Sequence, residues 1–271
     1  MLRLSEQSFG TLRMLFERES GIRLRDEKRT LVVSRLQARL EQRGMRSMED
    51  YCALLLRPAE QEERQRMVDA LTTHETYFFR EPRHFEHLAQ QALPALTQRP
   101  LRIWSAASST GEEVYSLAMT LAETLGPAGW ELLGSDISTR VLDVAQRGLY
   151  VLNRLECMPR MFLQKYCRRG FGQYEGQLLI NSSLRARTRF LRHNLLDASN
   201  PLGSFDVIFL RNVLIYFDPE RRRYIVRNMI SRLNPGGFIY FGSSESVSGS
   251  TEGLESVASS VFRRPMQRMK P

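Results

Sequence analysis

The second part of the chain alternates short apolar segments with helical ones, and this alternation constrains the fold more than any other feature. Apolar runs of strand length begin near residues 101, 130, 188, 205 and 237, and helical patterns follow the first two, over about 112–124 and 139–147. Strands that alternate with helices build a mainly parallel sheet covered on both faces. The expected strands are LRIWSAA (101–107), WELLGSD (130–136), TRFLRHN (188–194), FDVIFLRN (205–212) and GFIYFG (237–242). The sequence therefore predicts an α/β domain over residues 99–271.

One segment of this domain, from Leu149 to Arg187, is too long to be a connecting loop. It contains RRGFGQYEGQLLINSSLR, in which glycines separate short strand-like pieces. We therefore predict a small β-subdomain inserted in the α/β domain, over about residues 150–187.

The first part of the chain, up to about residue 95, has helical periodicity. Gly21 and Gly44 mark the ends of the first two helices, Ser47 has the position of an N-cap, and another helix is expected over about 60–71. The apolar stripe of the first two helices contains Phe9, Leu12, Leu15, Phe16, Val32, Leu36 and Leu40. We predict an all-α N-terminal domain over residues 1–80 and a linker helix over 81–98.

The formal net charge of +9 is concentrated in two regions. Residues 23–46 carry an excess of +5 and residues 147–192 an excess of +8, so the rest of the chain is net acidic. Arg35, Arg39 and Arg43 recur every fourth residue and share one helix face, which is either merely solvated or available to a partner. Two local basic surfaces favour an anionic partner.

Polar side chains follow the predicted strands at the points where the strands end. Asp136 ends the second strand, Asn194 the third, and Arg211 and Asn212 the fourth. The carboxyl ends of parallel strands meet at one edge of a sheet, where ligands bind in such folds. Nucleotide-binding folds hold a ribose diol with an acid at the position of Asp136, although this residue suits the N-cap of the next helix equally well.

The first strand leads into SAASSTGEE (105–113), a turn of small residues at a helix N-terminus. This turn matches neither the dinucleotide fingerprint nor a Walker loop. Glu112 and Glu113 would repel a phosphate and suit a cationic or hydroxyl-bearing ligand. Two acids in the first turn of a helix are also stabilising without any ligand.

Several classes of protein and site are not expected. The chain has no run of about 18 apolar residues, and Glu6 and Gln7 stand where a signal peptide has its apolar core. The three cysteines lack the spacing of a disulfide framework or a zinc module, which favours a reducing cytoplasm. His84 and His87 have a spacing that suits metal ligands on a helix, but no third ligand is apparent, so no metal is predicted.

Five sequence blocks together resemble the chemotaxis receptor methyltransferases, the CheR family, in their order and spacing. The blocks are THETYFFRE (73–81), IWSAASSTGEEVYSLA (103–118), GSDIS (134–138), FDVIFLRNVLIYFD (205–218) and LNPGGFIYFGSSES (233–246). The set is specific, and it extends over nearly the whole chain. The sequence departs from many relatives at His74, Val114 and Ser243, where asparagine, proline and histidine are frequent.

The resemblance implies a class I S-adenosylmethionine-dependent methyltransferase domain of Rossmann-like fold, with an inserted β-subdomain and an all-α N-terminal domain. It implies methyl transfer from S-adenosyl-L-methionine to glutamate side chains of chemoreceptors, which gives glutamyl methyl esters and S-adenosyl-L-homocysteine. By the same resemblance, the expected cofactor contacts are His74, Thr76, Arg80, Glu113, Asp136, Asn194, Leu195, Arg211 and Asn212.

Such a reaction is consistent with the lack of a recognisable catalytic triad. A glutamate side chain is already ionised at neutral pH, because its pKa is about 4.3, and it needs no general base. The enzyme has to align the carboxylate with the methyl group and exclude water. Arg80 or Arg211 suits the first task, and Tyr216 suits a place beside the sulfonium unless it is a core residue. Arg80 and Tyr216 are therefore the expected catalytic residues.

The partners implied by the resemblance are the acidic cytoplasmic helices of chemoreceptors. We expect the Arg35/Arg39/Arg43 face to lie along such a helix and the insertion to provide a second contact. In the insertion, RGFGQYEG resembles the family's subdomain that captures a receptor's C-terminal tail by strand addition. Its expected contact residues are Arg168, Arg169, Arg185 and Arg187.

Two other functions fit parts of the sequence less well. A nucleic-acid methyltransferase would suit the isoelectric point near 9.9. However, the fourth strand leads into RNVLIYF rather than an Asn/Asp-Pro-Pro-aromatic loop, and the basic insertion lacks interleaved aromatic residues. A non-catalytic adaptor would not need polar groups at every strand end. The sequence thus predicts a cytoplasmic protein-glutamate O-methyltransferase that neither binds nucleic acid nor inserts in a membrane.

Overall fold

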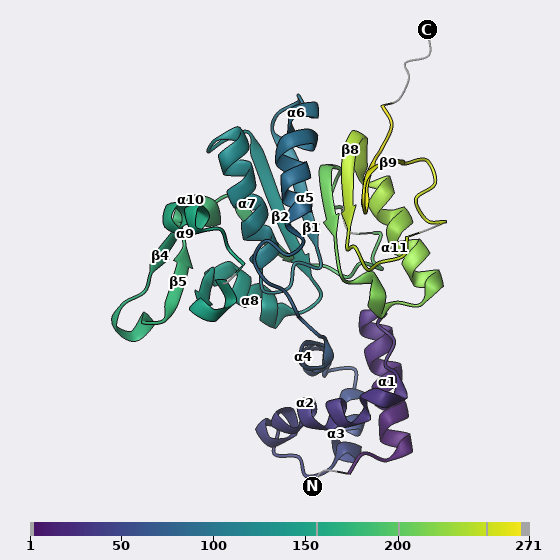
Figure 1. Cartoon of the computed structure of the whole chain (residues 1–271). Helices are drawn as coiled ribbons and strands as arrows, with labels where there is room; N and C mark the ends of the chain where they lie inside the picture. The colour runs from purple at the N-terminus through teal and green to yellow at the C-terminus, as the bar shows by residue number, and fades with distance from the viewer. Residues whose placement is uncertain (1–2, 156, 200, 248, 267–271) are drawn as a thin grey trace.

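The computed structural model describes residues 3–155, 157–199, 201–247 and 249–266. A helical domain lies at one end of the molecule, below a larger α/β domain from which an insertion projects to the side (Figure 1). The helical domain is built from α1 (Glu6–Ser20), α2 (Arg29–Gln42), α3 (Met48–Leu55) and α4 (Gln61–Leu71).

The helical domain forms as its sequence predicts. All the apolar stripe residues named above are buried in one cluster with residues of α3 and α4. Gly21 ends α1 with a φ of 73°, a left-handed conformation that glycine adopts without strain. The side chain of Ser47 accepts a hydrogen bond from the backbone N–H of Asp50 at 3.1 Å, so Ser47 is the N-cap of α3.

The basic face of α2 packs on α4. Arg39 donates two hydrogen bonds to the Glu63 carboxylate, from Nε to Oε1 at 3.0 Å and from Nη2 to Oε2 at 2.6 Å. The Glu63 side chain is 3% exposed, and the hydroxyl of Tyr51 also donates to it, at 2.9 Å. A buried carboxylate needs such partners, because an unpaired charge is costly away from water.

The other two arginines of this face are also engaged within the domain. Arg35 donates to the carbonyl oxygens of Leu71 and Thr72, both at 2.8 Å, where α4 ends and its carbonyl groups attract a cation. Arg43 lies 3.2 Å from Glu60. The three arginines share one face of α2, as predicted, and that face contacts α4 and the residues that flank it. Docking of a receptor helix on this face stays a prediction.

The α/β domain contains one large sheet. Its strands are β1 (Leu101–Ala106), β2 (Trp130–Asp136), β6 (Thr188–Arg192), β7 (Phe205–Leu210), β8 (Leu233–Phe241), β9 (Glu255–Ala258) and β10 (Val261–Arg263). They lie in the order β6-β2-β1-β7-β8-β10-β9. All pairs from β6 to β8 are parallel, and β10 is antiparallel to both of its neighbours. The order reverses between β1 and β7, which is where such folds bind ligands.

Helices cover both faces of this sheet. They are α5 (Pro82–His87), which continues through a π-helical turn (Leu88–Ala92) into α6 (Leu93–Ala95), and α7 (Glu112–Leu125), α8 (Thr139–Arg147) and α11 (Pro219–Ser231). Successive side chains of a strand point to opposite faces of the sheet, so they pack into two different hydrophobic cores. Ile103, Val207 and Tyr240 pack with α5 and α7, whereas Trp104, Ile208 and Ile239 pack with α11. No helix within the described residues is long and apolar enough to cross a membrane.

The expected strands are all present, and β2 and α8 have the expected bounds. β8 begins four residues earlier than predicted, at Leu233, and the two antiparallel strands β9 and β10 were not predicted. Both are short, and most residues of β9 are exposed, so neither strand carries a long apolar pattern. α11 was also not predicted. Its first turns contain Arg221, Arg222 and Arg223, so its buried apolar residues begin only at Ile225.

The insertion has a small antiparallel sheet in the order β3-β5-β4, from β3 (Leu149–Val151), β4 (Cys167–Arg169) and β5 (Gln177–Ile180). It also contains α9 (Arg160–Tyr166) and α10 (Ser182–Arg185). Of its four expected contact arginines, Arg168 and Arg169 are exposed on the edge strand β4. Arg187 is also exposed and lies over the Trp130 ring, with 5.6 Å between the guanidinium carbon and the ring centroid.

Candidate functional site

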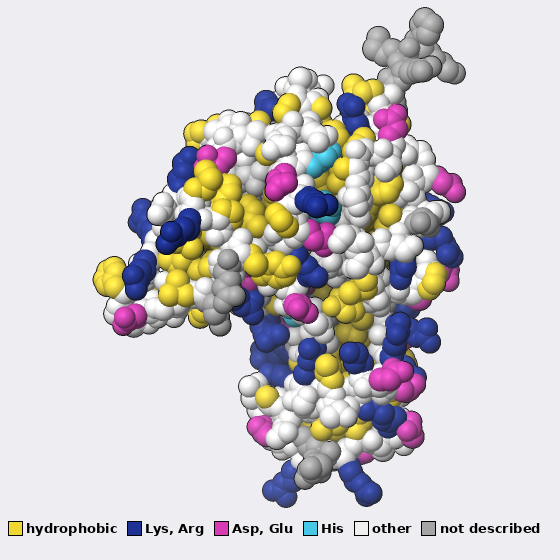
Figure 2. Space-filling model, in the orientation of Figure 1, with side chains coloured by type: hydrophobic (Ala, Val, Ile, Leu, Met, Phe, Trp, Pro, Cys, Tyr) yellow, Lys and Arg dark blue, Asp and Glu magenta, His cyan; other side chains and the backbone are white. Residues whose placement is uncertain are grey.

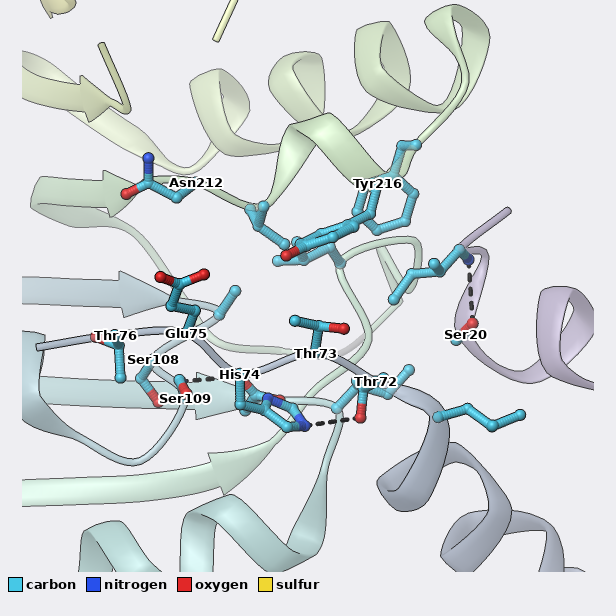
Figure 3. A pocket seen from close by; sticks show the side chains of 18 of the residues that line it. Ser20, Thr72, Thr73, His74, Glu75, Thr76, Ser108, Ser109, Asn212 and Tyr216 are labelled. Atoms are coloured by element: carbon cyan, nitrogen blue, oxygen red, sulfur yellow. Dashed lines mark hydrogen bonds between the residues drawn. The ribbon is translucent and has the colours of Figure 1, made fainter. Parts of the chain in front are cut away.

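A pocket lies at the carboxyl ends of β1, β2, β6 and β7, where the strand order reverses. All ten residues that the sequence suggested for the site line this pocket: His74, Thr76, Arg80, Glu113, Asp136, Asn194, Leu195, Arg211, Asn212 and Tyr216. They come from the linker that follows α4, from the first turn of α7, from the end of β2 and from the segments that follow β6 and β7. Figure 3 shows His74 and Ser109 on one side of the pocket and Tyr216 on the other.

The helical domain forms another wall of the same pocket, which the sequence did not indicate. This wall contains Phe16, Ser20, Ile22, Arg23, Leu24, Lys28 and Leu31. The domains are held together beside it by α4, because Asp69 accepts hydrogen bonds from the backbone N–H and the hydroxyl of Thr139, at 3.0 and 2.8 Å. Asp69 thereby caps the N-terminus of α8 from the other domain.

Asp136 is buried at the end of β2, with 6% of its surface exposed. Its carboxylate accepts hydrogen bonds from the backbone N–H groups of Ser109 at 2.9 Å and Ser138 at 3.0 Å. Burial raises the pKa of Asp136 to about 6, although these hydrogen bonds oppose the shift. A carboxylate has about four acceptor positions, so Asp136 retains capacity for hydroxyl groups in the pocket.

The turn after β1 presents polar atoms without partners in the protein. The hydroxyls of Ser108 and Ser109 and the Nε of Arg211 are buried and make no hydrogen bond to any described residue, and all three residues line the pocket. Ala107 and Ser109 have φ values of 63° and 50°, which are unfavourable for residues with a Cβ. Buried polar groups of this kind fit a polar ligand that supplies their hydrogen bonds.

Arg211 forms the charged centre of the pocket wall. Its side chain is 1% exposed, and Nη1 donates to Oε2 of Glu113 at 2.9 Å. Nη2 donates to the backbone oxygen of Arg80 at 2.6 Å and lies 3.4 Å from Glu81. These partners leave Arg211 little freedom to orient a substrate carboxylate, one of the two roles considered for it.

Arg80 and Tyr216 are more accessible than Arg211, since both are only partly buried. Arg80 donates one hydrogen bond, to the backbone oxygen of Glu75 at 3.0 Å, and lies over the Tyr77 ring. Burial and the nearby Glu75 raise the pKa of Tyr216, so its phenol is neutral at neutral pH. Tyr216 lines the pocket and also packs, partly buried, against the apolar cluster that contains Leu214 and Phe217.

Two of the expected contact residues have their polar atoms paired within the protein. The His74 ring lies 2.7 Å from the Thr72 hydroxyl (Figure 3), and burial lowers its pKa to about 4, so the ring is neutral. Asn194 donates from Nδ2 to the backbone oxygen of Glu19 at 3.0 Å and accepts from the N–H of Leu196. Asn194 thus joins the end of β6 to α1 of the helical domain.

Glu81 is a site residue that sequence reasoning missed. It lies in the THETYFFRE block and has a φ of 57°. Its Oε1 accepts from Asn212 Nδ2 at 3.3 Å, and its Oε2 accepts from the backbone N–H of Ser243 at 3.1 Å. The block itself was the available signal, but nothing in it distinguished Glu81 from a surface acid.

Family models match almost the whole chain. The all-alpha domain of CheR methyltransferases matches residues 7–72, and the SAM binding domain of CheR methyltransferases matches residues 74–263. The boundary between the matches falls in the linker between α4 and α5. The second match contains every strand of the large sheet and all ten expected site residues, and it begins at the first of them, His74.

Curated relatives are similar over most of their length. The chemotaxis protein methyltransferase of Salmonella typhimurium is 40% identical over 250 residues, which are 91% of this chain and 86% of that protein. Chemotaxis protein methyltransferase 2 of Pseudomonas aeruginosa is 41% identical over 262 residues, 95% of this chain and 93% of that protein. The chain therefore belongs to the CheR methyltransferase family, with the all-α domain and the S-adenosylmethionine-binding domain of that family.

Proposed function

We propose that this protein transfers the methyl group of S-adenosylmethionine to glutamate side chains of chemoreceptors. The observation that supports the proposal best is the single pocket that collects all ten expected residues between the two domains. The orphaned hydroxyls of Ser108 and Ser109 beside Asp136 suit a cofactor rich in hydroxyl and charged groups. When bound, the cofactor supplies an electrophilic sulfonium methyl group.

On the cofactor side, Asp136 accepts the ribose hydroxyls, and Glu113 faces the cationic end of the ligand. On the substrate side, Arg80 is the proposed positioning group, because among the described residues its guanidinium has one hydrogen bond and spare donors. Tyr216 lies beside the reacting groups, where a neutral aromatic ring favours a cation. The substrate carboxylate is ionised at neutral pH, so these residues align the reactants and exclude water rather than move a proton.

Replacement Arg80→Ala is expected to lower the rate of methyl transfer at least about tenfold, because a charge-assisted contact that orients the substrate is lost. The measurement is the steady-state rate with receptor and cofactor both varied. Arg83→Ala, at an exposed position three residues later, is the matched control and should retain the parental rate. A parental rate for Arg80→Ala would show that Arg80 is only structural.

Cofactor affinity is expected to fall as the pH drops below about 6, because protonation of Asp136 removes an ionised acceptor. Asp136 is ionised at pH values well above this pKa, so the affinity for the cofactor should be constant in that range. Asp136→Asn should weaken binding by about 1–3 kcal/mol at neutral pH and abolish the dependence near pH 6. Calorimetry with S-adenosylhomocysteine measures both. Asp143→Asn, exposed on α8, is the control, and an unchanged affinity for Asp136→Asn would remove Asp136 from the site.

The receptor helix is proposed to dock on basic surfaces at the waist between the domains, which include part of the α2 face. A groove there lies between α2 and α4 of the helical domain on one side and α8 and the insertion on the other. The arginines that line it are Arg35, Arg39, Arg66, Arg140 and Arg154. Dark blue side chains gather around this waist in Figure 2. An acidic helix suits such a groove, since complementary charge aids docking.

The insertion is proposed as a second contact, for a receptor's C-terminal tail. β4 (Cys167–Arg169) is an edge strand of its sheet, so its outer backbone groups can pair with an added strand. Phe171, which follows β4, is 87% exposed and offers an apolar contact. Because the methylated receptor regions implied by the family are cytoplasmic, we propose that the protein acts in the cytoplasm.

The function is tested by incubating the protein with radiolabelled S-adenosylmethionine and receptor-containing membranes. Label that enters receptor and is released by mild base as methanol, as hydrolysis of a methyl ester requires, supports the proposal. Label that resists mild base, or enters added nucleic acid instead, would contradict it. Receptors with and without their tail segment, compared in the same assay, test the role of the insertion separately.

A further inference from the structure

The turn that follows β7 carries several residues of the pocket but has little regular structure of its own. Arg211, Asn212 and Tyr216 all line the pocket from this turn. Asn212 has a φ of 58°, and only the short 3-10 helix Leu214–Tyr216 follows. The conformation of this turn therefore needs support from another part of the chain.

That support comes from Glu245, in the loop after β8. Its Oε1 accepts hydrogen bonds from the backbone N–H groups of Val213 at 2.8 Å and Leu214 at 2.7 Å. Its Oε2 accepts from those of Asn212 at 2.9 Å and Gly242 at 2.7 Å. Hydrogen bonds to an ionised acceptor are stronger than neutral ones. One carboxylate therefore fixes three consecutive residues of the turn.

Burial and charge make this arrangement specific to a carboxylate. Glu245 is 8% exposed, and none of the ion pairs among the described residues involves it. Its negative charge is balanced by backbone N–H dipoles alone, and an amide side chain could not accept all four bonds. At Gly242, a Cβ would lie 2.9 Å from the backbone nitrogen of Asn212 and 2.9 Å from Oε2 of Glu245, so a larger residue would disturb the approach of the two loops.

We propose that Glu245 is a positioning residue for methyl transfer, which acts by holding the 211–214 turn so that Tyr216 and Arg211 keep their places in the pocket. The inference rests on the proposed function for its catalytic readout. Glu245 does not line the pocket itself, so its effect on the reaction must pass through the turn.

The test compares Glu245→Gln with the parent protein, well below the melting temperature of both. Glutamine keeps the size of the side chain, but its NH2 group cannot accept hydrogen bonds from the backbone N–H groups that Glu245 binds. We expect kcat to fall about tenfold or more with little change in the KM for receptor, because alignment rather than docking is impaired. Amide hydrogen exchange of residues 212–214 should become faster while the strands of the sheet keep their protection.

Glu245→Asp retains the charge and should restore part of kcat, and Glu252→Gln, at an exposed position nearby, is the matched control. Parental kcat and parental exchange at 212–214 in Glu245→Gln would overturn the inference, and so would a loss of protection spread over the whole domain. If Glu245→Gln does not fold, the same readings are made on Glu245→Asp. A parent protein without any methyl transfer would refute the proposed function instead, and the exchange data would still test the role of Glu245 in the turn.

Discussion

Replacement Arg39→Ala is expected to lower the free energy of unfolding by about 3 kcal/mol, because it leaves the Glu63 carboxylate buried without its bidentate partner. The Glu63 side chain is 3% exposed and that of Arg39 is 14% exposed, so water replaces the lost contact poorly. Chemical denaturation followed by circular dichroism measures the loss. Arg43→Ala, on the same face but 39% exposed, is the control and should cost less than about 1 kcal/mol.

The difference in unfolding free energy between the parent and Arg39→Ala should shrink as the pH falls. Burial alone would raise the pKa of Glu63, but the hydrogen bonds from Arg39 and Tyr51 hold it below its usual 4.5. A lowered pKa contributes stability above the unfolded-state value, and this stability is lost as the pH falls through the folded-state value. The parent and Arg39→Ala should therefore converge in stability in acid. Equal stabilities at neutral pH would show that Arg39 is dispensable to the helical domain.

Replacement Arg211→Ala is expected to weaken the binding of S-adenosylhomocysteine about a hundredfold or more. It removes the cation between the carboxylates of Glu113 and Glu81, which then repel each other at the pocket wall. Arg211→Lys should also bind poorly, because one ammonium group cannot reach both Glu113 and the backbone oxygen of Arg80. Isothermal calorimetry measures both affinities.

The control for Arg211 is Arg227→Ala, which removes an exposed arginine of α11. It should bind the cofactor product like the parent. If Arg211→Lys retained parental affinity, the forked geometry of the guanidinium would be irrelevant, and a point charge would suffice at this position.

The parts of the fold that the sequence predicted are those with a strong local pattern. β2 is a largely apolar run that ends in Asp136, and α8 begins directly after Ser138, so their bounds were predictable. The polar residues at strand ends were informative for the same reason, since Asp136 and Arg211 interrupt segments that are otherwise apolar. Parallel pairing then brings such residues to one edge without further information.

The parts that the sequence did not predict depend on contacts between distant segments. The spacing of Arg35, Arg39 and Arg43 showed that they share a face, but not that α4 would supply Glu63 and Glu60 to that face. Glu245 lies 33 residues from Asn212, whose N–H it accepts, and nothing local distinguishes it from a surface glutamate. The contribution of α1 and α2 to the pocket wall is likewise invisible in a helical pattern.

The position of the pocket between the two domains has a thermodynamic consequence. A ligand that binds only the folded state stabilises it by mass action, by about 2.7 kcal/mol when its concentration is a hundred times its dissociation constant. Here the walls come from both domains, so this stabilisation applies only while the domains are folded and docked together. With the cofactor bound in this pocket as proposed, its concentration affects how cooperatively the helical and α/β domains unfold, and removal of the cofactor weakens the link between them.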